Sequence, residues 1–127
     1  MEVFGSRWKN HWQRIAADWK SRVSDDDVVL IAGDTSWAMH LKEAQEDLDQ
    51  IRALPGKKII IRGNHDYWWE SAGKLNRMDA ENNMQYLYGS TAVLGDKDIA
   101  ICGTHGWVCP GDIHYQEDRD AKPYRRE

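Results

Sequence analysis

The stretch KKIIIRGNHDYWW, residues 57–69, runs from apolar residues directly into polar ones. Its three consecutive isoleucines are β-branched and uninterrupted, which indicates a strand that is buried on both faces of a parallel sheet. The glycine after them permits a sharp turn. Asn64, His65 and Asp66 then stand side by side, although a simple turn needs only one residue of this kind. The stretch therefore predicts a strand whose end carries a functional site.

The segment before this strand predicts a matching strand and a helix. VVLIA, residues 28–32, is another continuous β-branched run. Residues at helical spacing follow it: Trp37, Leu41, Ala44, Leu48 and Ile51. Ser36 or Thr35 is expected to cap this helix, and Pro55-Gly56 to end it. A strand, a helix of roughly 16 residues and a strand form a βαβ unit, so we expect parallel neighbouring strands with a right-handed crossover.

The remaining segments give weaker patterns. Apolar residues at helical spacing predict an amphipathic helix over residues 6–22, and a short helix is expected over 69–78. TAVLGDKDIAIC, residues 91–102, is typical of a β-hairpin. From Gly111 onward the chain is polar and charged, with almost nothing to bury.

Length and composition favour one small globular domain. The chain has 127 residues, of which 41% are hydrophobic and 30% charged. A net charge of −4 argues against strong general binding of nucleic acids or anionic membranes. No apolar run approaches the roughly 20 residues of a membrane span, and the first residues lack a signal-peptide pattern. Two cysteines are too few for a disulfide framework, so we expect a cytoplasmic protein.

Both predicted strands end in a glycine followed by a residue that can bind metal. IAGD supplies Asp34 and IRGN supplies Asn64. Parallel strands place these ends on one edge of the sheet, where open α/β proteins bind ligands, so the oxygens of Asp34 and Asn64 are expected to approach each other. His65 can act as an acid or base near neutral pH, and Asp66 can fix its tautomer.

A turn is the alternative to a site. A single GD pair after a strand is usually an ordinary turn. Four specified residues after a parallel strand, paired with an upstream GD, are much harder to obtain by chance. The sequence therefore favours a site with Asp34 and Asn64 as metal ligands and His65 and Asp66 as catalytic residues.

The blocks VVLIAGDTSW and IIIRGNHDYWW resemble two signature blocks of the calcineurin-like metallophosphoesterase superfamily, in particular its small bacterial cytoplasmic phosphohydrolases. The resemblance covers residues 28–69. It implies a four-layer α/β/β/α sandwich in which the parallel βαβ unit carries the site. It also implies two divalent metal ions, Mn²⁺, Fe²⁺ or Zn²⁺, and hydrolysis of phosphate mono- or diesters by a dimetal-bound hydroxide.

The resemblance also assigns roles to individual residues. Asp34 is similar to the aspartate that bridges the two metals, and Asn64 to an amide ligand of the second metal. His65 is similar to the histidine that contacts the phosphoryl oxygen or protonates the leaving group, and Asp66 to its orienting partner. The expected partner is a phosphorylated small molecule or a phosphodiester substrate.

The chain departs from the family pattern on both sides of these blocks. The family has an Asp-x-His block on an earlier strand, and later an isolated histidine and a Gly-His-x-His block. Residues 1–27 lack the first, and GTHGW, residues 103–107, has one histidine in a different pattern. We therefore expect residues 1–127 to form a single, incomplete domain that is a poor or inactive catalyst by itself. A missing first strand would leave a sheet edge uncovered, which invites self-association.

Two other functional classes compete with the phosphoesterase. Cys102, His105, Cys109 and His114 could form a structural zinc site, although their spacing is irregular. The chain could also be a catalytically incompetent binding or assembly module. His105 follows another predicted strand, but the sequence leaves open which edge of the sheet it reaches. The Trp68-Trp69 pair could line a substrate mouth or belong to the core.

Overall fold

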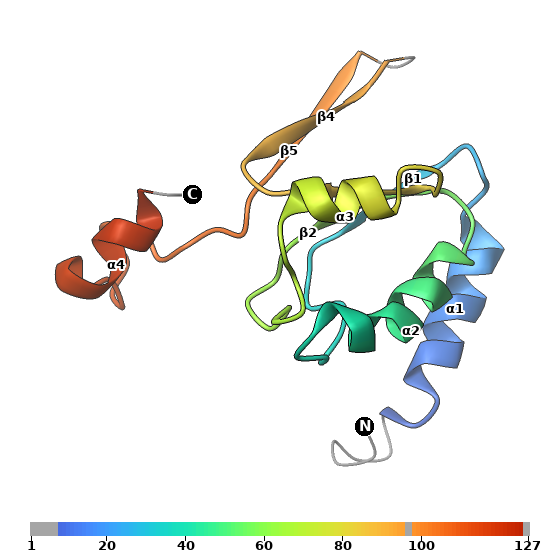
Figure 1. The fold of residues 1–127 in the computed structure, drawn as a ribbon, viewed down its shortest axis with the longest axis horizontal. Coiled ribbons are helices and arrows are strands. Elements are labelled where there is room, and N and C mark those ends of the chain that lie inside the picture. Colours follow the sequence, from blue (N-terminus) through green and yellow to red (C-terminus); the bar gives the residue numbers. More distant parts are fainter. Residues whose placement is uncertain (1–7, 96–97, 126–127) are drawn as a thin grey trace.

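The computed structural model describes residues 8–95 and 98–125. Four helices and five strands lie along them (Figure 1). In chain order they are α1 (His11–Arg22), β1 (Val28–Ile31), α2 (Leu41–Arg52), β2 (Lys57–Ile61), α3 (Ala72–Met78), β3 (Met84–Leu87), β4 (Ser90–Leu94), β5 (Ile99–Gly103) and α4 (Glu117–Tyr124).

The centre of the fold is a parallel three-stranded sheet in the order β1-β2-β3. Leu30 of β1 pairs with Ile59 of β2, and Ile60 of β2 pairs with Tyr86 of β3. The predicted βαβ unit is therefore confirmed, with its two strands parallel and adjacent. The third strand, β3, was not predicted. Among the described strands β1 lies at the sheet edge, so self-association through this edge stays a prediction.

Side chains alternate between the two faces of the sheet, and each face has its own cover. Ile60 points into a core that also contains Leu48 of α2 and Leu75 of α3. Ile59 points to the other face, where it packs with Ala92 of β4. The antiparallel hairpin β4–β5 thus covers one face and the helices cover the other. These three layers confirm the α/β class predicted for a fragment of the four-layer sandwich.

The helices are shorter than predicted. The first helix begins at His11 rather than residue 6, although residues 6 and 7 lie outside the described part of the chain. α2 has 12 residues instead of roughly 16, because the Glu43 carboxylate accepts hydrogen bonds from the amides of Met39 and His40 and starts the helix at Leu41. Among the described residues, no helix is long and apolar enough to cross a membrane.

Neither Ser36 nor Thr35 caps α2. The Ser36 hydroxyl instead donates to the Asp47 carboxylate, at 2.5 Å. Trp37 therefore lies outside the helix, and its indole is exposed rather than part of the apolar stripe.

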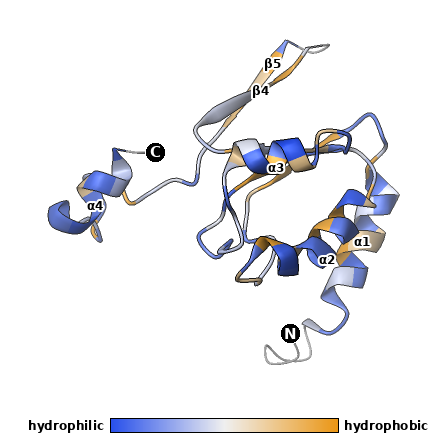
Figure 2. Ribbon diagram, in the orientation of Figure 1, coloured by the Kyte–Doolittle hydropathy of each residue, from blue (hydrophilic) through white to orange (hydrophobic). Residues whose placement is uncertain are grey.

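The segment after β5 contains one more helix than expected. α4 forms from the polar sequence EDRDAKPY, at the end of an extended segment away from α1 (Figure 1). Figure 2 shows that the residues of this helix are largely hydrophilic. One buried side chain organises it: the Asp120 carboxylate accepts hydrogen bonds from the Trp107 indole, at 3.1 Å, and from the Gln116 amide, at 2.8 Å. The sequence pattern did not predict this helix, because a buried carboxylate anchors it and not a stripe of apolar side chains.

Candidate functional site

The ends of β1 and β2 touch each other through two glycines. A Cβ atom on Gly33 would lie 2.2 Å from the Gly63 nitrogen, and one on Gly63 would lie 2.1 Å from Asp34 Oδ1. Gly33 also has a φ of 92°, which residues with side chains rarely adopt. Only glycine therefore fits at both positions. Asp34 itself has a φ of 53°, an uncommon conformation outside glycine that often marks a functional position.

Asp34, Asn64 and His65 form the exposed rim of this site. The His65 amide donates to Asp34 Oδ1 at 2.9 Å, and His65 Nδ1 lies 3.1 Å from Asp34 Oδ2. Asn64 Nδ2 lies 3.1 Å from the same ring nitrogen. The hydrogen bond from the His65 amide, followed by the contact with its ring, lowers the pKa of Asp34 below its usual value. The rim thus holds an exposed carboxylate against an imidazole.

Asp66 and Trp68 form the buried floor beneath the rim. The Asp66 carboxylate accepts hydrogen bonds from the amides of Asp34, Thr35 and Gly63, each at 2.8 Å, and from the Trp68 indole at 2.9 Å. It therefore ties the two strand ends together. This differs from the expectation that Asp66 orients the His65 ring, since the contact with that ring comes from Asp34.

The two tryptophans after the GNHD block belong to the core. Trp68 is 1% exposed and Trp69 is 7% exposed. Trp69 packs edge to face on Tyr86, with ring centroids 5.4 Å apart. The hypothesis that this pair lines a substrate mouth is therefore wrong. Two aromatic side chains that the sequence analysis did not assign to the site, Trp37 and Tyr67, are exposed and contact the His65 ring instead.

A polar cleft of about 460 Å³ opens at the strand ends. Asp34 and Asn64 line it together, as expected for ends that share one edge of the sheet. His105 lines it as well, which settles the edge that this histidine reaches. Gly103 at the end of β5 brings it there, because a Cβ on Gly103 would lie only 2.4 Å from the Ile61 side chain.

Arg62 is a further cleft residue that the sequence analysis missed. Its Nε atom is buried and has no hydrogen-bond partner among the described residues. A buried guanidinium nitrogen without a partner is costly, and anionic groups satisfy it best. The sequence position of Arg62 could have indicated this, because it lies between the β2 isoleucines and the GNHD block. Residues at the carboxyl end of a parallel strand border the ligand site.

The donors in the cleft suit divalent cations but are few. Asp34 and Asn64 offer oxygen atoms, which Mg²⁺ and Mn²⁺ prefer, and His105 offers an imidazole, which Zn²⁺ and Fe²⁺ also accept. Across residues 8–95 and 98–125, no three His, Cys, Asp or Glu side chains gather closely enough to hold a metal together. The residues therefore fit a loosely held cation with open coordination positions rather than a complete dimetal centre.

The alternative zinc site receives no support from the geometry. Cys102 Sγ lies 3.3 Å from the Thr91 hydroxyl on the neighbouring strand. Cys109 donates to the Trp107 carbonyl oxygen at 3.5 Å. Together with His105 and His114, these cysteines form no metal-binding group within the described residues.

Comparison with known protein families identifies a match. A family model described as calcineurin-like phosphoesterase matches residues 6–126. The match extends well beyond the two blocks at residues 28–69 and covers nearly the whole chain. No curated protein and no solved structure matches the chain.

Proposed function

We propose, since the chain belongs to the calcineurin-like phosphoesterase family, that its strand-end site hydrolyses phosphate esters with the help of divalent cations. One observation carries the proposal: the Asp34 carboxylate contacts the imidazole of His65 and also lines a cleft together with Asn64 and Arg62. This arrangement combines cation ligands, a group that can transfer a proton and an anion-binding guanidinium.

Asp34 and Asn64 would hold the cation. The lowered pKa of Asp34 keeps this residue ionised at neutral pH, in the form that binds metal. His105 is the nearest further donor in the same cleft. A bound divalent cation would polarise the phosphoryl oxygens and lower the pKa of water. Few ligands imply weak cation binding, so we expect turnover by residues 1–127 alone to fall below the roughly 1–10³ s⁻¹ of ordinary enzymes.

His65 would act on the leaving group. In hydrolysis the oxygen of water bonds to phosphorus, and the bond from phosphorus to the ester oxygen breaks. The departing oxygen takes a proton, and His65 on the rim can provide it. Asp34 holds the ring through Nδ1, while Asp66 acts only as a positioning residue through the backbone of both loops.

Arg62 would bind the phosphoryl group. Arginine pairs with phosphate oxygens through its planar guanidinium, and the bond is charge-assisted. Arg62 lines the cleft beside Asp34, so a phosphate ester bound there would lie next to this cationic residue. The ester would thus be held between Arg62 and the rim.

Hydrolysis of chromogenic esters tests this proposal. 4-Nitrophenyl phosphate and bis(4-nitrophenyl) phosphate report on mono- and diesterase activity with Mn²⁺, Fe²⁺ or Zn²⁺ added. We expect slow, cation-dependent hydrolysis that a chelator stops and that Asp34→Ala and His65→Ala each abolish. Asp118→Ala, an exposed carboxylate on α4, is the matched control and should leave the rate unchanged. Hydrolysis that persists in both site variants would overturn the proposal.

A further inference from the structure

Asp34 lies where two different clefts meet. The polar cleft contains Arg62 and His105. A second cleft, of about 480 Å³, also reaches Asp34, but its other walls are largely apolar. We call it the apolar cleft; its apolar walls include Trp8, Trp12, Ile15, Ile31 and Trp37. A ligand at Asp34 therefore has Arg62, His105 and Trp107 on one side and a largely apolar wall with several tryptophans on the other.

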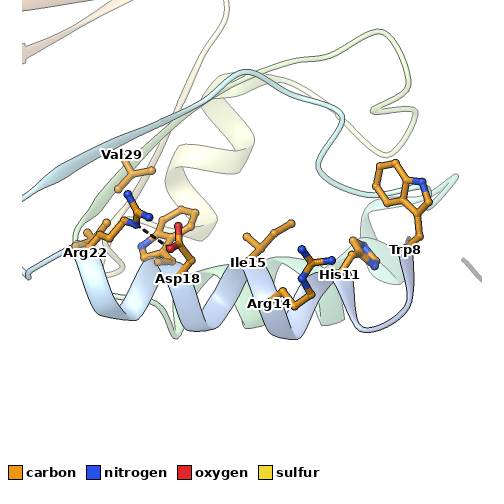
Figure 3. Close-up of a pocket in the computed structure, with 9 residues that line it drawn as sticks. Trp8, His11, Arg14, Ile15, Asp18, Arg22 and Val29 are labelled. Carbon is orange, nitrogen blue, oxygen red and sulfur yellow. Dashed lines mark hydrogen bonds and ion pairs between the residues drawn. The ribbon is translucent and has the colours of Figure 1, made fainter. Parts of the chain in front are cut away.

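The apolar cleft is formed where the α1 segment lies beside the strand ends. Figure 3 shows Trp8 and Ile15 projecting from the α1 segment toward the same side, the side on which Val29 lies. Both residues also line a longer groove of about 920 Å³ that runs along α1 to Arg22 and Val29. The apolar cleft and this groove share Trp8, Ile15 and Trp19, and the volume of each lies within the range of about 300–1,000 Å³ typical of ligand sites.

Trp37 is the residue that connects the apolar cleft to the reacting groups. Its indole is 66% exposed, yet it stacks on the His65 ring with centroids 5.7 Å apart and an interplanar angle of 24°. Tyr67, 53% exposed, contacts the same ring edge to face at 6.2 Å. Exposed aromatic faces stack on planar rings of ligands. The side of His65 from which a leaving group would depart therefore offers an aromatic surface.

We propose, building on the proposed function, that the apolar cleft binds a planar aromatic ring in the alcohol part of the substrate. The ring stacks on Trp37 while the phosphoryl group lies against Arg62 in the polar cleft. The preferred substrate is then a phosphate ester of a nucleoside or an aryl alcohol, not of a small polyol. Both sources present the same feature, a flat aromatic ring close to the ester oxygen.

Adenosine 5′-monophosphate and ribose 5-phosphate form a matched pair for the test, because they share the phosphate ester and the ribose, and a hydroxyl group replaces the planar base in the second. Phenyl phosphate represents the aryl source. Binding to the full chain is measured by saturation-transfer NMR titration without added cation, so that turnover is not needed. We expect adenosine monophosphate or phenyl phosphate to bind about 10-fold more tightly than ribose 5-phosphate, the order of one stacking interaction.

Variants of Trp37 locate the ring. Trp37→Ala should remove the preference, and Trp37→Phe should keep most of it. Tyr124→Ala, an exposed aromatic on α4, should leave it unchanged. Because Trp37 is exposed, unfolding by urea should be nearly the same for all three variants, which separates a lost contact from a lost fold.

The outcomes separate this inference from the proposed function. Ring-dependent binding that requires Trp37 supports the inference even if no ester is hydrolysed. A preference for only one of the two aromatic ligands supports it and identifies the source of the ring. Equal affinity for ribose 5-phosphate and both aromatic ligands, or a preference that survives Trp37→Ala, overturns it even if hydrolysis is observed.

Discussion

The floor and the rim of the strand-end site contain the same kind of group in opposite surroundings. Asp66 in the floor is fully buried, and its oxygens accept hydrogen bonds from the backbone of both strand ends. Asp34 on the rim is exposed and faces the His65 ring. The floor carboxylate thus holds the shape of the site, whereas the rim carboxylate is accessible to a ligand.

This difference teaches that the GNHD block has two separable tasks. Its aspartate supports the loop, because a buried carboxylate with several charge-assisted hydrogen bonds fixes backbone that would otherwise move. Its asparagine and histidine stay on the rim beside Asp34. Substitutions in the floor should therefore change stability, and substitutions on the rim should change chemistry.

Asp66→Ala should have the largest effect. Without the carboxylate, the amides of Asp34, Thr35 and Gly63 and the Trp68 indole lose their acceptor. Each unsatisfied buried donor costs about 1–3 kcal/mol, so we expect a loss of at least about 3 kcal/mol, measured by urea unfolding. Asp66→Asn keeps one acceptor oxygen and should lose less. A loss of under about 1 kcal/mol in Asp66→Ala would remove the distinction between floor and rim.

Asp79→Ala provides a buried comparison outside the site. The Asp79 carboxylate accepts hydrogen bonds from Arg52, at 2.6 and 3.0 Å, and from the Tyr86 hydroxyl at 2.6 Å. Removing one partner of a buried ion pair costs about 3–5 kcal/mol, and we expect about 3 kcal/mol here. Because Asp79 does not line the cleft, affinity for Mn²⁺ should not change. A loss of cation binding in stably folded Asp79→Ala would contradict this.

The contribution of Asp79 should also depend on pH. Burial opposes ionisation, but hydrogen bonds from Arg52, Tyr86 and Asn82 outweigh it and lower the pKa of Asp79. Its stabilising effect is therefore present above the unfolded-state pKa of about 3.9 and is lost as the pH falls through the folded-state value. The stability difference between the native sequence and Asp79→Asn should shrink below about pH 4.

Asp34→Gly should change stability by less than about 1 kcal/mol. The variant loses exposed contacts with His65, but glycine adopts the φ of 53° without strain. Asp34→Ala removes the same carboxylate and keeps the strain, so it should be less stable than Asp34→Gly. Thermal unfolding of the pair measures the difference. The reverse order would mean that Asp34 is part of the supporting structure.

His65→Ala should have the smallest effect on stability, within about 0.5 kcal/mol, because the half-buried ring contacts only the exposed side chains of Trp37, Tyr67 and its polar neighbours. It should nevertheless lower turnover by 10²–10⁴-fold, the usual contribution of a general acid. Its cation content should stay close to that of the native sequence, measured by elemental analysis after gel filtration. Equal loss of cation in His65→Ala and Asp34→Ala would show that the two residues share one role.

The sequence predicted the βαβ unit well because its signals are local. The apolar runs at 28–32 and 59–61 specify strands, and an apolar stripe specifies the helix between them. Burial on both faces was right for β2 but wrong for β1, where Leu30 is exposed. β3 was missed because MQYL is short and contains a glutamine, and its strand conformation depends on pairing with β2. The start of α2 was misplaced because Glu43 determines it, whereas the prediction relied on Ser36 and Thr35.

The candidate site was only half visible in the sequence. Motif spacing identified Asp34, Asn64 and His65, because the ends of parallel strands meet at one edge. The bonds of Asp66 could not be predicted, since they join backbone amides about 30 positions apart in the chain. The position of His105 in the cleft depends on how the β4–β5 hairpin packs against Ile61, and no local sequence pattern predicts that packing.

Titration of Mn²⁺ into the native sequence and Asp34→Gly, followed by electron paramagnetic resonance, tests the central claim most directly. The claim is that the rim carboxylate binds the cation while the floor holds the fold. We predict that Asp34→Gly weakens Mn²⁺ binding at least 10-fold, with an unfolding temperature like that of the native sequence. Equal Mn²⁺ affinity in the two proteins would contradict the account, because the strand-end carboxylate would then not be the cation ligand.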